Sequence, residues 1–453
     1  MIILKHKQVI NLLLISFPFA FLNAQDSHYW SNQYGTEASL LGGLVVGSKH
    51  DLSSTFYNPG SLALTTDQIL TISSDAFQIT QIDVTSNSQD TPNLESRTSG
   101  TVPGIIAFRL PFEELGKHQI AFSLLVRDEV KTDFYGRDIN RSGLTGITAN
   151  DGIIFQNHSE TWLGFSWGYK IKERIGIGIS QYVAIRSQRQ RIQIINQVFE
   201  DSLTTAAGLL FSDVFFNNFK ILWKAGILFD HRPLSFGFSV TTPSLNLFNY
   251  TGEASLNVSQ INSAVEEQFI AVSDQRGLDS EYKTPFSIAA GAAYYTGSTS
   301  IYFTAEWFAS LSQYEVLNTK PVSVLQTGNV IPNRNLLSRR PVFNYGVGVN
   351  HKLGSDLSLY GSIFTNNSAR ESGLVSKYSL SSYNILHFLG GVALKYKIID
   401  LILGLGYAFG NDNIETLGDI INPDNSISSS AQSSGAEVTY RNYKIVFAFS
   451  LKL

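Results

Sequence analysis

A serine between glycines is the first place in the sequence where catalysis could be expected. The stretch Gly164–Gly168 (GFSWG) matches the G-x-S-x-G pattern, in which a nucleophilic serine occupies a sharp turn between a strand and a helix. Here the strand pattern continues through Tyr169, so Ser166 is interpreted as an ordinary strand residue. The eight histidines form no H-E-x-x-H motif, and the chain has no cysteine, so neither a zinc site nor thiol chemistry is predicted. We expect no enzyme and no cofactor.

Three basic residues are the best candidates for contacting a ligand. Arg127, Arg186 and Lys224 lie in segments of alternating hydrophobicity, on the face that carries mainly small residues. A Lys or Arg facing lipid near mid-membrane costs about 2–4 kcal/mol, so these side chains are expected to point into a lumen. Two roles stay open: pairing with carboxylates or an internal segment, or holding the anionic head group of a ligand. The same parity applies to Arg109, Lys395 and Glu306.

Alternating segments are the elements that must position these side chains. In Arg174–Ser187, in Asp400–Gly410 and in the last segment of the chain, large apolar residues occupy one face, and Gly, Ala and Ser are frequent on the other. The small face of a soluble sandwich would be wet and would carry more charge, whereas Gly, Ala and Ser fit an enclosed lumen. Segments of roughly 10–14 residues are long enough to cross a membrane at a tilt.

About fourteen such segments are predicted within residues 68–453, and the connections between them alternate in length. The strands are expected at 69–80, 102–110, 118–129, 158–170, 174–187, 219–230, 233–247, 285–296, 300–313, 342–352, 357–366, 385–397, 400–411 and 438–453. Short periplasmic turns and long outer loops are typical of outer-membrane barrels. The predicted fold is therefore an all-β, antiparallel transmembrane barrel of about fourteen strands.

Composition and the N-terminus agree with an exported barrel. Charged residues make up 15 % of the chain, and the net charge of −4 gives no reason to expect nucleic acid as a partner. Residues 1–24 have the parts of a secretory signal: Lys5 and Lys7, an apolar run, and a cleavage site at Leu22–Ala24. No later segment approaches the 18 or so apolar residues of a transmembrane helix. The expected location is the outer membrane of a Gram-negative bacterium.

Residues 25–67 are expected to form a plug inside the barrel. The stretch Gly35–Leu62 shows no strand alternation and is crowded with small residues, which allow backbone to pack closely against an inner wall. It closes on a strong turn signal, because proline fixes φ and glycine accepts a positive φ. The plug residues singled out are Gly42, Gly43, Asn58, Pro59 and Gly60. The alternative is a surface loop ahead of the barrel.

Two of the long outer connections contain apolar patterns of their own. Helices are predicted within Leu203–Phe219 and Asn257–Ser273 from the spacing of apolar residues. Each helix either covers the small core of its own loop or contributes to an apolar vestibule outside the membrane, where a hydrophobic molecule could first leave water. The residues singled out are Phe211, Phe215, Phe216, Val265 and Phe269.

Together these features resemble the FadL family of outer-membrane transporters of long-chain fatty acids and aromatic hydrocarbons. The likeness rests on the signal peptide, the small-residue segment, the strand count and the apolar third and fourth outer loops. Thr284–Tyr294 with Phe303–Trp307, and Lys224–Phe229 leading into Leu234–Ser239, are similar to hairpins of that family. Where the family pattern often continues Asn-Pro with Ala, this chain has Gly60.

The resemblance implies an N-terminal hatch in the barrel and capture of fatty acids or other hydrophobic compounds at the outer loops. It also implies exit through the wall into outer-membrane lipid at an inward kink of the third strand, which in this chain is His118–Glu129 and contains neither Pro nor Gly. Uptake by a monomer without an energy source is the expected activity. The alternative is an outer-membrane or secreted β protein with a structural or adhesive role.

Overall fold

Fourteen antiparallel strands close into a barrel in the computed structural model of the chain. The structure describes residues 27–65, 67–86, 93–142, 146–200, 203–248, 252–262, 267–371, 381–414 and 436–452. In chain order the strands of the ring are β1 (Gln68–Ser86), β2 (Leu94–Arg109), β3 (His118–Ser142), β4 (Gly146–Lys172), β5 (Ile175–Glu200), β6 (Leu203–His231), β7 (Leu234–Thr241), β11 (Ser287–Thr296), β12 (Thr299–Phe308), β17 (Val342–Lys352), β18 (Leu357–Asn366), β19 (Asn384–Tyr396), β20 (Ile399–Ile414) and β21 (Ala436–Lys452). Because β1 pairs with both β2 and β21, the ring has no free edge, and the predicted 14-stranded antiparallel barrel is confirmed.

The remaining elements lie beside or inside the ring. Along the outer part of β6 run β8 (Leu245–Phe248) and β9 (Gly252–Asn262), and β10 (Glu267–Leu278) pairs with β9. Two small sheets follow, β13 (Leu311–Leu317) with β16 (Asn335–Arg339) and β14 (Val322–Ser323) with β15 (Val330–Ile331). The helices are α2 (Glu37–Leu40), α3 (Ser54–Tyr57), α4 (Pro59–Leu62) and the 3-10 helix η1 (Glu113–Leu115).

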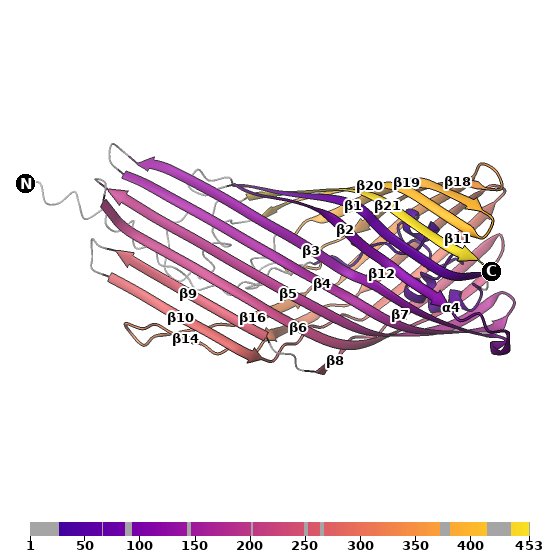
Figure 1. The fold of residues 1–453 in the computed structure, drawn as a ribbon, viewed down its shortest axis with the longest axis horizontal. Helices are drawn as coiled ribbons and strands as arrows, with labels where there is room; N and C mark the ends of the chain where they lie inside the picture. The colour runs from indigo at the N-terminus through magenta and orange to yellow at the C-terminus, as the bar shows by residue number, and fades with distance from the viewer. Residues whose placement is uncertain are drawn as a thin grey trace, which may run out of the picture.

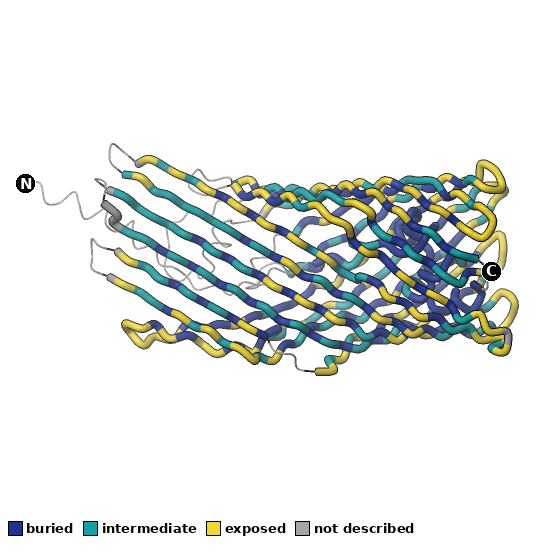
Figure 2. The backbone as a smooth tube through the Cα atoms, viewed as in Figure 1, coloured by how far each residue is buried: buried dark blue, intermediate teal, exposed yellow. Residues whose placement is uncertain are grey.

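The outer wall of the barrel is apolar, and β7 shows the contrast with small and polar residues on its inner face. In β7 the exposed residues are Leu234, Phe236, Phe238 and Val240, whereas the serines, glycine and threonine between them are buried. A soluble protein would place these two sets the other way round, so the outer face is suited to lipid. The alternation of exposed and buried residues continues around the wall (Figure 2). Among the described residues, no helix is long and apolar enough to cross a membrane.

The neighbouring strands β3, β4, β5 and β6 extend far beyond the rest of the ring, with 25, 27, 26 and 29 residues (Figure 1). The connections expected at 130–157 and 188–218 are therefore mainly strand. The helix predicted within Leu203–Phe219 is wrong, because this segment is the outer half of β6 and pairs with β5 and β9. The helix predicted within Asn257–Ser273 is also wrong, because the described part of this segment belongs to β9 and β10. A spacing of four residues fits both a helix turn and two strand repeats, and here strand pairing decides.

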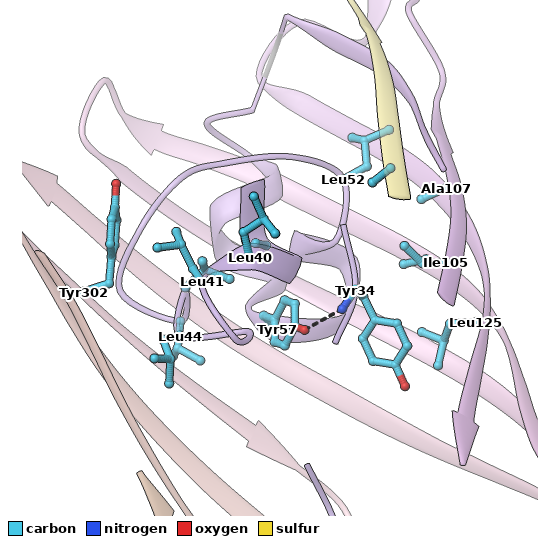
Figure 3. Packing of buried hydrophobic residues seen from close by; sticks show 14 of the residues in the cluster. Tyr34, Leu40, Leu41, Leu44, Leu52, Tyr57, Ile105, Ala107, Leu125 and Tyr302 are labelled. Atoms are coloured by element: carbon cyan, nitrogen blue, oxygen red, sulfur yellow. Dashed lines mark hydrogen bonds between the residues drawn. The ribbon is translucent and has the colours of Figure 1, made fainter. Parts of the chain in front are cut away.

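Residues 27–65, called the N-terminal segment below, lie inside the ring at the end where the connections are short. Helix α4 packs against β4, β5 and β6, and most of the segment is buried (Figures 1 and 2). Tyr34, Leu40, Leu41 and Tyr57 pack against wall residues such as Leu125, and the Tyr34 amide donates a hydrogen bond to the Tyr57 hydroxyl at 2.8 Å (Figure 3). The segment thus lies within the barrel and not on its surface.

The turn expected at Asn58–Gly60 is the start of helix α4, with Asn58 as its N-cap, and it joins the N-terminal segment to the wall. The Asn58 side-chain amide donates to the carbonyl oxygens of Val46 at 2.7 Å and Ile227 at 3.0 Å, and its oxygen accepts from the Gly60 amide at 3.0 Å. A Cβ on Gly60 would lie 2.7 Å from the Cα of Ile227, so only glycine allows this approach. On the wall side, a Cβ on Gly178 would collide with the Pro59 carbonyl.

Two further glycines shape the N-terminal segment. Gly42 and Gly43 have φ angles of 66° and 75°, a region that L-residues with side chains rarely adopt. A Cβ on Gly42 would also meet the Phe364 ring of the wall. The small residues singled out in the sequence therefore occupy positions where backbone conformation or close approach to the wall requires them.

Candidate ligand-binding lumen

A pocket that contains two cations is lined by the N-terminal segment and the barrel wall. We call it the basic pocket, and its lining includes Arg127, Lys224, Glu306 and aromatic residues of the N-terminal segment and the wall. The aromatic lining residues are Tyr29, Trp30, Phe56, Tyr57, Trp162 and Phe308. A pocket with aromatic walls and a few charged groups is typical of sites for small amphipathic molecules.

Within the part of the chain that the structure describes, both cations of the basic pocket lack a carboxylate at ion-pair distance. The Arg127 guanidinium donates to the Tyr29 carbonyl at 2.6 Å and lies 5.6 Å from the centre of the Phe56 ring, and the Lys224 ammonium lies 4.7 Å from that centre. Among the described residues, neither cation has a carboxylate oxygen within 4.0 Å. Glu306 lines the same pocket, but its two oxygens accept from the Trp30 indole at 2.8 Å and a serine hydroxyl at 2.7 Å.

Arg186 is placed differently, within a largely buried group of ionisable side chains that we call the ionic cluster: Asp128, His158, Glu160, Arg186 and Lys220. The Arg186 guanidinium lies 3.1 Å from Glu160 and 3.4 Å from Asp128, and the Lys220 ammonium lies 3.0 Å from Glu160. His158 Nε2 lies 2.8 Å from Asp128. With two cations facing two carboxylates, Arg186 is compensated inside the barrel, which is the pairing alternative left open by the sequence.

An aromatic ring covers the ionic cluster from the connection between β10 and β11. The Tyr282 ring centre lies 4.0 Å from the Arg186 guanidinium carbon and 4.7 Å from the Lys220 ammonium. Phe216 lies next to it, with 6.5 Å between ring centres. Cations over ring faces are attracted by the ring quadrupole, so Tyr282 adds to the stabilisation of this cluster.

The carboxylates and Lys220 of the ionic cluster were not predicted from the sequence, although the alternating pattern indicates an inward direction for two of these residues. Glu160 of β4 and Lys220 of β6 are buried on the lumen side, and the alternation of each strand predicts this inward direction. What the alternation does not give is the register between strands, and it is the register that sets Glu160 opposite Arg186. The inward parity of Arg109, Arg186 and Lys224 is confirmed, since all three are buried.

The wall is interrupted next to the basic pocket. Strand β3 carries a bulge at Arg127, because Val126 pairs with Thr161 and Asp128 pairs with Glu160, which leaves Arg127 as the extra residue. The Val126 carbonyl accepts hydrogen bonds from the N-terminal segment, namely from Asn32 at 3.1 Å and Tyr34 at 2.9 Å. The bulge allows consecutive residues to face the lumen, so Arg127 reaches the basic pocket and Asp128 the ionic cluster.

Pairing of β3 with its other neighbour, β2, stops at the same place. It runs from Arg109 to Ile105 of β2 and returns only at Glu95, opposite Tyr135. Residues 96–104 and 126–134 thus face each other without ladder pairing, and they line a cavity of about 160 Å³ that we call the wall pocket. The third strand is therefore irregular at a place where it has neither Pro nor Gly, since the segment His118–Glu129 contains none. Pro103 and Gly104 lie in the facing strand at a register shift against β1.

Apolar residues line the barrel interior toward the extended end. This apolar compartment includes Phe134, Ile154, Ile192, Ile194, Leu210, Leu256 and Val258. Phe269 packs against it, and Phe216 is buried beside Tyr282. Phe211 and Phe215 occupy the opposite face of β6, where the Arg191 guanidinium lies 5.9 Å from the Phe211 ring centre. The structure therefore does not bring Phe211 and Phe215 to the interior with Phe216, because successive residues of a strand point to opposite faces. Val265 lies outside the described residues.

The glycine-flanked serine has no catalytic geometry. Ser166 lies inside β4, is fully buried and shares a hydrogen bond of 2.7 Å with the Ser180 hydroxyl. Its neighbour Phe165 is exposed on the outer face. The sharp strand-to-helix turn that exposes a nucleophilic serine is absent at this position.

Comparison with known proteins identifies the fold. No family model matches the chain, and no curated protein matches it in sequence. The Pseudomonas putida toluene transporter TodX superposes with a TM-score of 0.61 at 11 % identity, covering 93 % of this chain and 99 % of that one. The Ralstonia pickettii toluene transporter TbuX gives 0.58 at 13 % identity over 93 % and 99 %. A Pseudomonas aeruginosa FadL homologue gives 0.56 at 12 % identity over 95 % and 99 %.

The closed wall and apolar exterior are those of an outer-membrane β-barrel. The resemblance seen in the sequence is confirmed at the level of architecture: this chain has the fold shared by the FadL homologue, TodX and TbuX.

Proposed function

We propose that this protein is a passive outer-membrane channel through which hydrophobic and amphipathic molecules enter the cell. The observation that carries the proposal is the basic pocket, where Arg127 and Lys224 lie against aromatic rings without a carboxylate partner among the described residues. Lys224 is buried and Arg127 is half-buried, so leaving both cations uncompensated beside aromatic rings is costly, and an anionic ligand would reduce that cost.

The arrangement of compartments supports a route for an acyl chain. The apolar compartment lies toward the extended end, and each methylene that enters it from water gains about 0.8 kcal/mol. The head group then meets Arg127 and Lys224 in the basic pocket. A long-chain carboxylate therefore fits both parts, whereas a bare hydrocarbon such as those named for TodX and TbuX would use only the apolar and aromatic surfaces.

The N-terminal segment supports exit through the wall. We propose that residues 25–67 act as a plug that blocks passage along the axis of the barrel formed by residues 68–453. The fit of Gly60 and Gly178 at the wall leaves no space for an acyl chain at that contact. The wall pocket between β2 and β3 then provides the exit into outer-membrane lipid, and a monomer is sufficient for this route.

Ligand binding by the full-length protein in nanodiscs tests the proposal. The variant Arg127→Gln with Lys224→Gln is expected to weaken laurate binding at least about tenfold, since each charged hydrogen bond contributes roughly 1.5–3 kcal/mol. The matched control is Arg189→Gln, which removes an exposed cation on the outer face of β5. Equal laurate affinity of all three proteins, or no laurate binding at all, would favour the structural or adhesive alternative.

The chain has no cysteine, so the exit can be tested by introduced disulfides. Thr101→Cys with Glu129→Cys places thiols on the two strands that border the wall pocket, and Ile106→Cys with Leu124→Cys places them where β2 and β3 pair. Oxidation of the first pair is expected to slow fatty-acid uptake into vesicles, and reduction to restore it. Unchanged uptake with the first disulfide formed would exclude this exit.

A further inference from the structure

The wall pocket differs in chemistry from the basic pocket. Its lining combines apolar residues such as Ile82, Phe134 and Ile385 with many hydroxyl and amide groups from β1, β2, β3 and β21. A simple passage for hydrocarbon would not need these polar groups, because polar groups facing an apolar ligand lose their hydrogen bonds to water.

Two buried polar atoms of the wall pocket have no partner among the described residues. They are the Thr132 hydroxyl and His387 Nε2, and each residue is only 5 % exposed. The His387 ring is fixed by stacking on Phe364, with ring centres 4.6 Å apart and planes 5° from parallel. Buried polar atoms are almost always hydrogen-bonded, so atoms of this kind in a pocket indicate a partner that the protein itself does not supply.

The charges around the wall pocket balance one another. Lys444 lies 2.6 Å from a glutamine oxygen and 3.2 Å from Asp75, so its charge is compensated. The remaining charged side chains of the lining, Glu129 and Lys131, are of opposite sign. In contrast to the basic pocket, nothing here favours an anion over a neutral group.

We propose that the wall pocket is a second binding site, specific for the uncharged hydroxyl-bearing head group of an amphiphile such as a monoacylglycerol. Thr132 can donate or accept, and His387 Nε2 can do either according to its tautomer, which matches the donor and acceptor character of a hydroxyl. The apolar residues of the lining receive the first part of the acyl chain. This inference rests on the proposed channel function and adds neutral amphiphiles to its substrates.

Binding of three probes with the same carbon chain length distinguishes the two sites. Laurate, monolaurin and dodecane are titrated against the full-length protein in nanodiscs, at a pH where laurate is ionised. The variant Thr132→Val with His387→Phe keeps size and ring stacking but removes both polar atoms. We expect it to bind monolaurin about tenfold more weakly and laurate unchanged. The Arg127→Gln, Lys224→Gln variant is expected to show the opposite pattern.

A second measurement leaves Thr132 and His387 untouched. Thr101→Cys adds a single thiol at the rim of the wall pocket, and its alkylation rate is measured with each probe. Protection by monolaurin but not by laurate supports the proposal. If laurate binds at the basic pocket while monolaurin neither binds nor protects, this inference is wrong and the channel function stands. If no probe binds, both fall, and water satisfies the two polar atoms.

Discussion

Replacing Glu160 by glutamine tests whether the ionic cluster is held by charge. One Glu160 oxygen accepts from the Trp162 indole at 2.7 Å and lies 3.0 Å from the Lys220 ammonium, and the other lies 3.1 Å from the Arg186 guanidinium. The side chains of Glu160, Arg186 and Lys220 are 5 %, 1 % and 0 % exposed. Glutamine keeps the shape and one acceptor oxygen, so the change removes mainly the negative charge.

The magnitude follows from what remains after Glu160→Gln. Arg186 and Lys220 would stay buried, with Asp128 as the only carboxylate of the cluster, at 3.4 Å from Arg186. Breaking a buried ion pair by removing one partner costs about 3–5 kcal/mol, because the other charge is left uncompensated. We therefore expect the free energy of unfolding to fall by about 3–5 kcal/mol.

Denaturant unfolding in lipid vesicles, followed by tryptophan fluorescence, measures this loss. The matched control is Asp274→Asn, which breaks an exposed pair with Arg276 and is expected to cost less than about 1 kcal/mol. Adding Lys220→Met to Glu160→Gln restores a balanced cluster and should recover about 0.5–3 kcal/mol. If Glu160→Gln costs no more than the exposed control, or if Lys220→Met makes it worse, the assignment of the cluster as a compensated, dry network is refuted.

Three other substitutions follow from the wall and the N-terminal segment. Leu403→Arg places a charge on the exposed outer face of β20 and should cost about 2–4 kcal/mol in the same assay, whereas Leu403→Phe should be near neutral. Gly178→Val conflicts with the Pro59 carbonyl, so it should displace the N-terminal segment and raise small-solute leakage in vesicle swelling while the barrel keeps its heat-modifiable gel mobility. Asn58→Ala removes two donated hydrogen bonds and one accepted from the Gly60 amide, and a loss of about 1–3 kcal/mol in unfolding free energy is expected; no loss would show that this turn does not anchor the segment.

The barrel could be predicted from the sequence because its alternation is the reverse of that in a soluble sheet. In β7, Leu234, Phe236 and Phe238 are separated by Ser235 and Gly237. The alternation within a single strand of this kind shows which of its faces meets lipid, so the neighbouring strands need not be known. The same holds for the inward direction of Lys224, whose position in β6 fixes its parity.

The extended half of β5 and β6 could not be predicted in this way. Beyond Arg186 the outer face of β5 carries Arg189 and Arg191, so the contrast in polarity between the two faces weakens. Apolar residues such as Leu210 and Val214 then stand four apart, which a helix and a strand satisfy equally. Pairing with β9, a long-range contact, decides for the strand, and the sequence of one segment does not contain it.

The bulge at Arg127 explains why the binding site was harder to predict than the wall. A strand that alternates strictly can send only every second residue inward, and Arg127 and Asp128 both face the lumen because the bulge shifts the parity of β3 between them. Pairing of β3 with β2 also ends beside the inserted residue, and the wall pocket lies where it is missing. After the bulge, Asp128 is fixed by its contacts with His158 and Arg186. Before the bulge, the Val126 carbonyl accepts a hydrogen bond from the Tyr34 hydroxyl. A single irregularity thus supplies a cation to the basic pocket, a carboxylate to the ionic cluster and the break in the wall, so the three features are expected to change together when the bulge is lost.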